Sequence, residues 1–85
     1  MKVVPFNEPG DSRTGTLKGV TFKQVEEILG FPANVDDDPD KVTHSWGFKV
    51  NGKHCGIWDY KGSTQLSTFG PDEIFEKLFG KKYSK

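Results

Sequence analysis

The chain has 85 residues, and its 12 Lys and Arg residues balance its 12 Asp and Glu residues, so the formal net charge is zero. This balance argues against a duplex-DNA binder, which needs surplus cations to displace counterions, and equally against an acidic DNA mimic. Hydrophobic residues make up only 33% of the chain while aromatic residues reach 13%, so we expect one thin core built on a few large rings.

Cysteine content and hydropathy suggest that the protein acts in the cytoplasm. Cys55 is the single cysteine, so no internal disulfide can form, which suits a reducing environment. No apolar run approaches the roughly 20 residues of a membrane helix, and the N-terminus lacks the apolar stretch of a signal peptide. We expect one cytoplasmic domain, 1–85, with a loop-rich N-terminal segment 1–19 and a basic tail 81–85.

The first predicted elements are an edge strand and a helix. Residues 2–6 can form a short edge strand, since Pro5 cannot occupy a central position, and the turn-rich residues 7–16 predict a loop. Residues 21–29 predict a helix in which Thr21 and Gln24 form a capping box and Gly30 ends the helix. Its apolar residues fall on one face, which we expect to pack on the core: Phe22, Val25, Ile28 and Leu29.

An acidic segment follows the helix. Asp36, Asp38 and Asp40 alternate as in a calcium loop, but Lys41 stands where that loop needs Gly and Gly47 where it needs Glu. We interpret the segment as a solvated acidic loop that holds no metal.

Residues 42–60 predict a β-hairpin, because Asn51-Gly52 is a strong signal for a type I′ turn. A short third strand at 65–69 and a second helix at about 71–79 follow, with Pro71 at the helix start. The expected fold is α+β, a three-stranded antiparallel sheet with both short helices packed on one face. Side-chain alternation gives the hairpin a core face made of Val42, His44, Trp46, Phe48, Val50, Cys55 and Ile57.

The other face of the hairpin carries the candidate binding residues. Gly47 lies opposite Gly56, so bare backbone is expected in the middle of this face, with aromatic and polar side chains around it. Trp58 and Tyr60 fit a second core layer under the N-terminal segment or the second helix, a subunit interface, or the floor of a pocket for a planar ligand. The candidate ligand- or partner-binding residues are Thr43, Ser45, Gly47, Lys49, His54, Gly56, Trp58 and Tyr60.

No catalytic constellation is found. His44 faces Asp59 across the strands, which could fix one imidazole tautomer or simply satisfy a histidine at the core edge. His54 and Cys55 point to opposite faces, so they cannot form a nucleophile–base pair, and the few His and Cys residues do not make a zinc site. We expect a non-enzymatic protein without metal or cofactor, with a solvated lysine tail.

The order of these motifs resembles a family of small accessory proteins of tailed bacteriophages. The matching pieces are VEEILGFP (25–32), KVTHSWGFKVNG (41–52), GIWDYK (56–61) and TFGPDEIFEKL (68–78). Family members carry a Trp-His-Ile-Gly-Gly-like segment before the last helix, where this chain has LSTFGP (66–71), so a site built by that segment would differ here. The resemblance implies a phage protein that acts in the cytoplasm of the bacterial host.

Two functions follow from this setting. The first is counter-defence by sequestering a nucleotide-derived immune signal in a homo-oligomer, with Trp58 and Tyr60 stacking on a base and Lys49 and His54 meeting a phosphate. The alternative is inhibition of a host protein, such as a nuclease or immune effector, through the same sheet face. Nucleic-acid binding is expected at most as a weak single-stranded contact.

Overall fold

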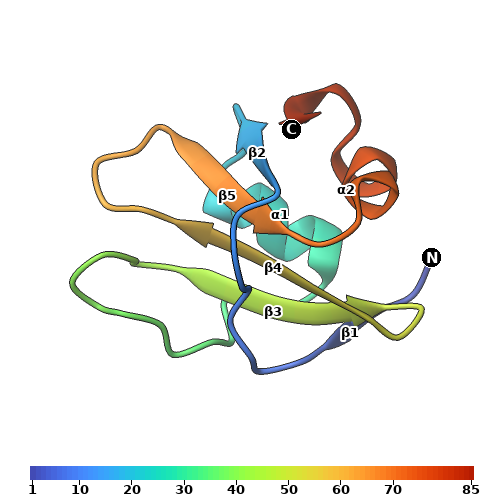
Figure 1. Ribbon diagram of the computed structural model, residues 1–85, viewed down its shortest axis with the longest axis horizontal. Coiled ribbons are helices and arrows are strands. Elements are labelled where there is room, and N and C mark those ends of the chain that lie inside the picture. Colours follow the sequence, from blue (N-terminus) through green and yellow to red (C-terminus); the bar gives the residue numbers. More distant parts are fainter.

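The computed structural model describes residues 1–85 and combines two helices with one six-stranded antiparallel sheet of order β1-β3-β4-β5-β2-β6 (Figure 1). No helix is long and apolar enough to cross a membrane. The elements in chain order are β1 (Val3–Pro5), β2 (Gly15–Lys18), α1 (Phe22–Leu29), β3 (Ser45–Val50), β4 (Lys53–Asp59), β5 (Gln65–Phe69), α2 (Asp72–Phe79), a 3₁₀ turn (Gly80–Lys82) and β6 (Tyr83–Ser84).

The α+β class is confirmed, but the prediction of a three-stranded sheet is wrong. β1 adds an edge strand with Pro5 at its end, while β2 and β6 lie in segments that we expected to be loop and tail. β2 has four residues and β6 has two, so neither carries an alternation of hydrophobic and polar residues long enough to predict a strand. Each is fixed instead by one large buried side chain, Leu17 in β2 and Tyr83 in β6.

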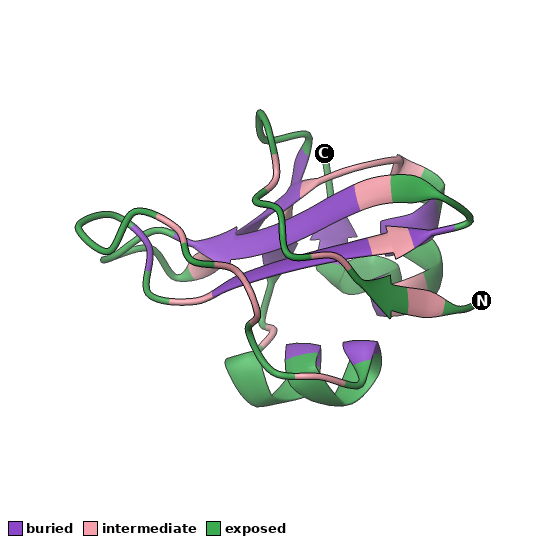
Figure 2. Cartoon of the chain, turned by 90° about the horizontal axis from the view of Figure 1, so that it is seen from below, coloured by how far each residue is buried: buried purple, intermediate pink, exposed green.

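The predicted hairpin register is confirmed. Gly47 pairs with Gly56 and Phe48 with Cys55 along β3 and β4. Asn51 and Gly52 have φ values of 53° and 77°, as a type I′ turn requires. Both helices lie on the same side of the sheet (Figure 2), where the core gathers Leu17, Val25, Leu29, Trp46, Phe48, Val50, Cys55, Ile57, Leu66, Ile74, Phe75, Phe79 and Tyr83.

Helix α1 has the predicted capping box, in which Thr21 and Gln24 bond each other's backbone N–H groups. Its apolar face, however, is wider than its contact with the sheet. Val25 and Leu29 are buried, whereas Phe22 and Ile28 keep 37% and 41% of their surface exposed on either side of the buried stripe. The expectation that all four pack on the core is therefore met by only two.

Residues 6–14, which we call the strap, connect β1 to β2 by crossing the sheet on the side opposite the helices (Figure 1). The Phe6 N–H donates to the Gly47 carbonyl (2.9 Å), and the Thr14 N–H donates to the Thr68 carbonyl (2.7 Å). A Cβ atom at Gly47 would lie 2.2 Å from the Phe6 carbonyl oxygen, and one at Gly56 would lie 2.9 Å from Gly10 Cα. The glycines of the sheet thus allow the strap to lie on bare backbone.

Candidate functional site

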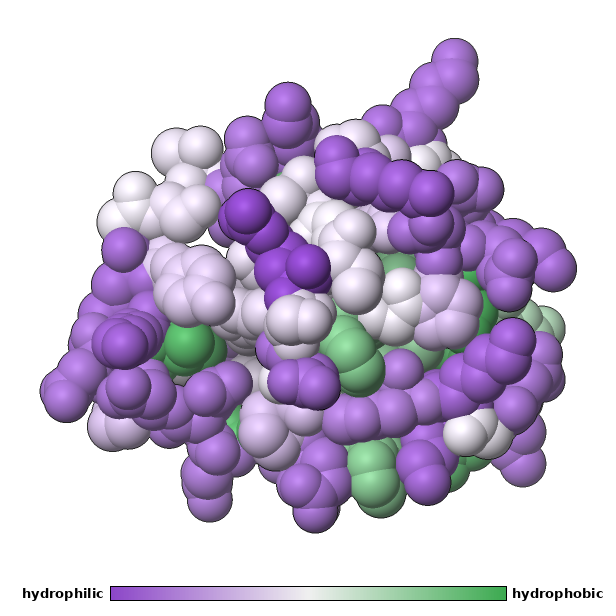
Figure 3. Space-filling model, in the orientation of Figure 1, coloured by the Kyte–Doolittle hydropathy of each residue, from purple (hydrophilic) through white to green (hydrophobic).

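The bare backbone expected to floor a pocket is covered by the strap. Gly47 meets the carbonyl groups of Phe6 and Glu8, and Gly56 meets Gly10. Gly47 and Gly56 are both buried. Figure 3 shows this face of the molecule, where small separate hydrophobic areas lie among pale atoms of intermediate hydropathy, with hydrophilic atoms mainly around them. The close approach that the glycines permit is therefore made by the chain itself.

Two of the candidate residues, Lys49 and His54, contact one end of the strap. The Lys49 ammonium lies 4.0 Å from the centroid of the Phe6 ring, a cation–π contact. The His54 ring meets the rings of Phe6 and Phe69 edge-on, and its Nε2 lies 3.2 Å from the Glu8 carbonyl oxygen. These two side chains thus hold the strap on the sheet.

Trp58 and Tyr60 differ in exposure. Trp58 keeps only 5% of its surface exposed because Gly10 lies against its ring, which matches the second core layer considered from the sequence. Tyr60 keeps 44% exposed, and the two rings meet edge-to-face with their centroids 6.4 Å apart. Tyr60 is therefore the aromatic side chain that this face offers to a partner.

The exposed tyrosine borders a shallow hollow of about 190 Å³, which we call the Tyr60 corner. Three carboxylates and one ammonium group line it, so its local charge attracts cations and repels phosphates. The polar groups come from the strap and from the acidic loop between α1 and β3. Its lining residues are Gly10, Asp11, Asp37, Asp38, Lys41, Val42, Trp58 and Tyr60.

Thr43 and Ser45 lie around a neighbouring hollow of about 190 Å³, which shares Asp37 and Val42 with the Tyr60 corner. Ser45 is buried, and its hydroxyl donates to the carboxylate of Asp37 (3.2 Å). The eight candidate residues are thus divided among two hollows, the covered glycine floor and the contacts of the strap.

His44 and Asp59 have separate structural roles, because the Asp59 carboxylate bonds the backbone N–H of His44 and not its ring. The Asp59 carboxylate accepts hydrogen bonds from the Thr43 hydroxyl and from the backbone N–H groups of Thr43 and His44. Burial alone would raise the pKa of Asp59, but these hydrogen bonds outweigh it and hold the pKa below its ordinary value. The His44 ring instead stacks on Phe22, with ring centroids 3.9 Å apart.

Cys55 lies in the core with no exposed surface. Burial raises the pKa of its thiol to about 11, although nearby Lys53 acts in the opposite direction. Because the thiolate is the reactive form, this side chain behaves as a small apolar core residue.

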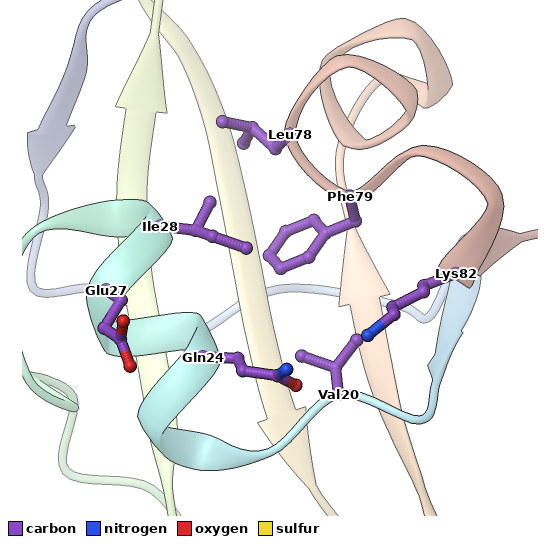
Figure 4. Close-up of a pocket in the computed structure, with 7 residues that line it drawn as sticks. All are labelled: Val20, Gln24, Glu27, Ile28, Leu78, Phe79 and Lys82. Atoms are coloured by element: carbon purple, nitrogen blue, oxygen red, sulfur yellow. The ribbon is translucent and has the colours of Figure 1, made fainter.

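A groove between α1 and α2 was not expected from the sequence. It has a volume of about 230 Å³, and apolar side chains from both helices form most of its surface (Figure 4). The available signal was the width of the apolar face of α1, which exceeds what one small sheet can cover. The lining residues are Val20, Gln24, Glu27, Ile28, Leu78, Phe79 and Lys82.

Comparisons with known proteins add no further constraint. No family model matches this chain, and no curated protein or solved structure shows significant similarity to it. No group of three or more His, Cys, Asp or Glu side chains is placed to hold a metal ion. The function is therefore inferred from the geometry of the surface.

Proposed function

We propose that this chain is a non-enzymatic binding protein that inhibits a host protein of the bacterium and contacts it through the Tyr60 corner. The resemblance of the sequence to phage accessory proteins supports a target inside a bacterial host. The observation that carries the proposed contact is the exposed ring of Tyr60 on the rim of a hollow lined by Asp11, Asp37 and Asp38.

The chemistry of the Tyr60 corner fits a basic protein surface. A tyrosine supplies a large rigid contact with a polar end, which is why it is frequent among residues that dominate binding energy. The carboxylates around it complement Lys and Arg side chains and set the orientation of docking. Nucleases and other enzymes that act on nucleic acids carry such cationic surfaces.

Sequestration of a nucleotide-derived signal is a second candidate. The specific observation in its favour is that Lys49 and His54 are half-buried rather than buried, so their cationic or donor groups reach the surface. A nucleotide that used the glycine floor would first have to displace the strap from Gly47 and Gly56. Its phosphates would also be repelled at the Tyr60 corner.

A binding experiment with matched variants tests the first proposal. The tagged protein is used to isolate its partner from host lysate, and the complex is reconstituted from the two purified proteins. Tyr60→Ala is expected to weaken the affinity at least about thirtyfold, since truncating a dominant interface tyrosine commonly costs about 2 kcal/mol or more. Lys49→Ala, at the other end of the sheet face, is the control and is expected to leave the affinity unchanged.

Native mass spectrometry of the protein isolated from bacteria with a nucleotide-signalling defence system separates the two candidates. A stoichiometric complex with one polypeptide supports the inhibitor. A mass increase that matches one nucleotide-type ligand per chain would contradict the inhibitor and support sequestration, provided that Lys49→Ala loses this ligand.

A further inference from the structure

We propose that the groove between α1 and α2 binds a small apolar carboxylate, whose chain lies against the helices and whose anionic group meets Gln24 and Lys82. This site lies on the helix side of the sheet, whereas the Tyr60 corner lies on the strap side. The inference is therefore independent of the proposed function.

The walls of the groove are apolar and come from three parts of the chain. Val20 precedes α1, Ile28 lies on α1, and Leu78 and Phe79 lie on α2 (Figure 4). Ile28 keeps 41% of its surface exposed and Leu78 is half-buried, so these side chains gain from being covered. An apolar body is the occupant that such walls favour.

One end of the groove presents hydrogen-bond donors. The Gln24 Oε1 atom already accepts the Thr21 N–H (3.0 Å), so the Gln24 amide offers its NH₂ group. The Lys82 ammonium donates one bond to the Gly19 carbonyl (3.2 Å) and keeps two protons for another acceptor. In Figure 4 the ends of these two side chains both point toward Val20, which lies between them in this view.

An amide NH₂ group and an ammonium group at one end of the groove favour a ligand that carries a negative charge. An alcohol can satisfy such a pair in part, but a carboxylate accepts from both groups and gains the stronger charge-assisted bonds. The remaining charged group of the lining, Glu27, directs its carboxylate away from the apolar walls (Figure 4). A ligand with one carboxylate, placed at the end formed by Gln24 and Lys82, therefore fits the groove.

The volume limits the size of the apolar body. A cavity of about 150 Å³ can hold a benzene molecule. The groove, at about 230 Å³, is larger than that and holds one ring or a short aliphatic chain together with its carboxylate. It is too small for a nucleotide or for a long-chain fatty acid within its walls.

The test is a titration of the isotopically labelled protein followed by amide chemical shifts, with hexanoate as probe and 1-hexanol as the neutral probe of equal chain length. Hexanoate is expected to shift amides of Val20, Ile28 and Leu78, with Kd on the order of 1 mM. Lys82→Met is expected to weaken hexanoate about fivefold to tenfold and to leave hexanol unchanged, since it keeps the aliphatic stem and removes the charge.

Two further variants control this result. Lys81→Met removes a neighbouring exposed charge outside the groove and is expected to leave hexanoate affinity unchanged. Ile28→Ser removes part of the wall and is expected to weaken both probes. Equal weakening by the two lysine variants, or no shift along α1 and α2 up to about 20 mM hexanoate, would overturn the proposal. Shifts of the same amides on dilution without any probe would assign the groove to a second copy of the chain, and would overturn it as well.

Discussion

Gly47 shows how one residue decides whether the second face of the sheet is open or covered. A Cβ atom there would lie 2.2 Å from the carbonyl oxygen of Phe6 and 2.3 Å from that of Glu8. Gly47→Ala must therefore lift the strap or push β3 out of register with its neighbours. The packing of the strap on Gly47 therefore also decides whether a ligand could reach this part of the sheet.

Gly47→Ala is expected to lower the free energy of unfolding by about 1–3 kcal/mol, as overpacking of a tight contact does. It should also speed cleavage by trypsin after Arg13, an exposed residue of the strap. Urea unfolding and timed proteolysis measure both effects. Lys49→Ala, at the next position on the same face of β3, loses only a cation–π contact and should cost less than about 1 kcal/mol. Unchanged stability of Gly47→Ala would show that the strap does not lie on the sheet.

Asp59 is expected to make acid stability depend on its hydrogen bonds. Its pKa is lowered in the folded protein, so its contribution is present above the unfolded pKa of about 4 and is lost as the pH falls through the lower folded value. Asp59→Asn should therefore reduce the free energy of unfolding by about 1–2 kcal/mol at neutral pH. The difference between the two proteins should shrink below about pH 4, which urea unfolding at several pH values can check. A difference that stays constant with pH would contradict this role.

Cys55 is expected to be inert toward thiol reagents in the folded protein. Its thiol is fully buried and has a pKa of about 11, so both access and ionisation are suppressed. Labelling with an aromatic disulfide reagent should follow global unfolding and become rapid in concentrated urea. Rapid labelling of the native protein would place Cys55 outside the core.

At the scale of elements, the residue patterns predict those parts of the fold that carry strong local signals. The hairpin register followed from the Asn51-Gly52 turn, and α1 followed from its capping box. The short strands β2 and β6 could not be predicted, because a single buried side chain in each, Leu17 or Tyr83, has no periodicity. Their positions depend on pairing with β5 and with each other, which is a tertiary effect.

The candidate site was predicted only in part for a similar reason. The opposed glycines of β3 and β4 indicated that something approaches the sheet closely, but a pattern of residues cannot distinguish a ligand from the chain's own backbone. The strap contains Phe6 and little other apolar surface, so its sequence gives no sign that it docks. Conversely, the exposed Phe22 and Ile28 were assigned to the core because periodicity shows the width of an apolar face and not the area available to cover it.

A hydrogen bond between the side chains of Tyr83 and Asp72 connects β6 to α2. The Tyr83 hydroxyl donates to Asp72, and Lys85 forms an ion pair with the same carboxylate (2.8 Å). Burial, with the hydrogen bond to Asp72, raises the pKa of Tyr83 to about 12. Because the folded value exceeds the unfolded value of about 10, this contribution is complete below about pH 10 and is lost as the pH rises toward 12.

The difference in phenolate absorbance between the native protein and Tyr83→Phe isolates this group from Tyr60. Tyr83 is expected to ionise near pH 12 in the folded protein and near pH 10 in urea. An apparent pKa near 10 under both conditions would mean that β6 does not pack as described.

At the scale of the whole molecule, a formal net charge of zero conceals an uneven distribution. The acidic loop of residues 36–40 supplies carboxylates to the Tyr60 corner and to the hollow beside it. Lysines are concentrated in the last residues of the chain, beside β2. Long-range steering by net charge is therefore weak, and we expect any attraction to the proposed partner to be local.

A local electrostatic contact predicts a moderate salt dependence. The affinity of the reconstituted complex is expected to fall as the salt concentration rises, because the carboxylates are exposed and therefore screened. The double variant Asp37→Asn and Asp38→Asn should remove most of this dependence. The double variant Glu73→Gln and Glu76→Gln on α2 loses the same charge on the other side of the sheet and should not. Titration calorimetry at several salt concentrations measures the slopes. Equal slopes for the two variants would place the contact elsewhere.

Photo-crosslinking in bacteria can locate the proposed partner contact on the surface of the protein. A photoreactive phenylalanine analogue is placed at Tyr60 in one variant and at Lys49 in another, and both are expressed in living bacteria before irradiation. We expect a covalent adduct with one host protein from position 60 and none from position 49. An adduct from position 49 alone, or none from position 60 when a complex is present, would contradict it.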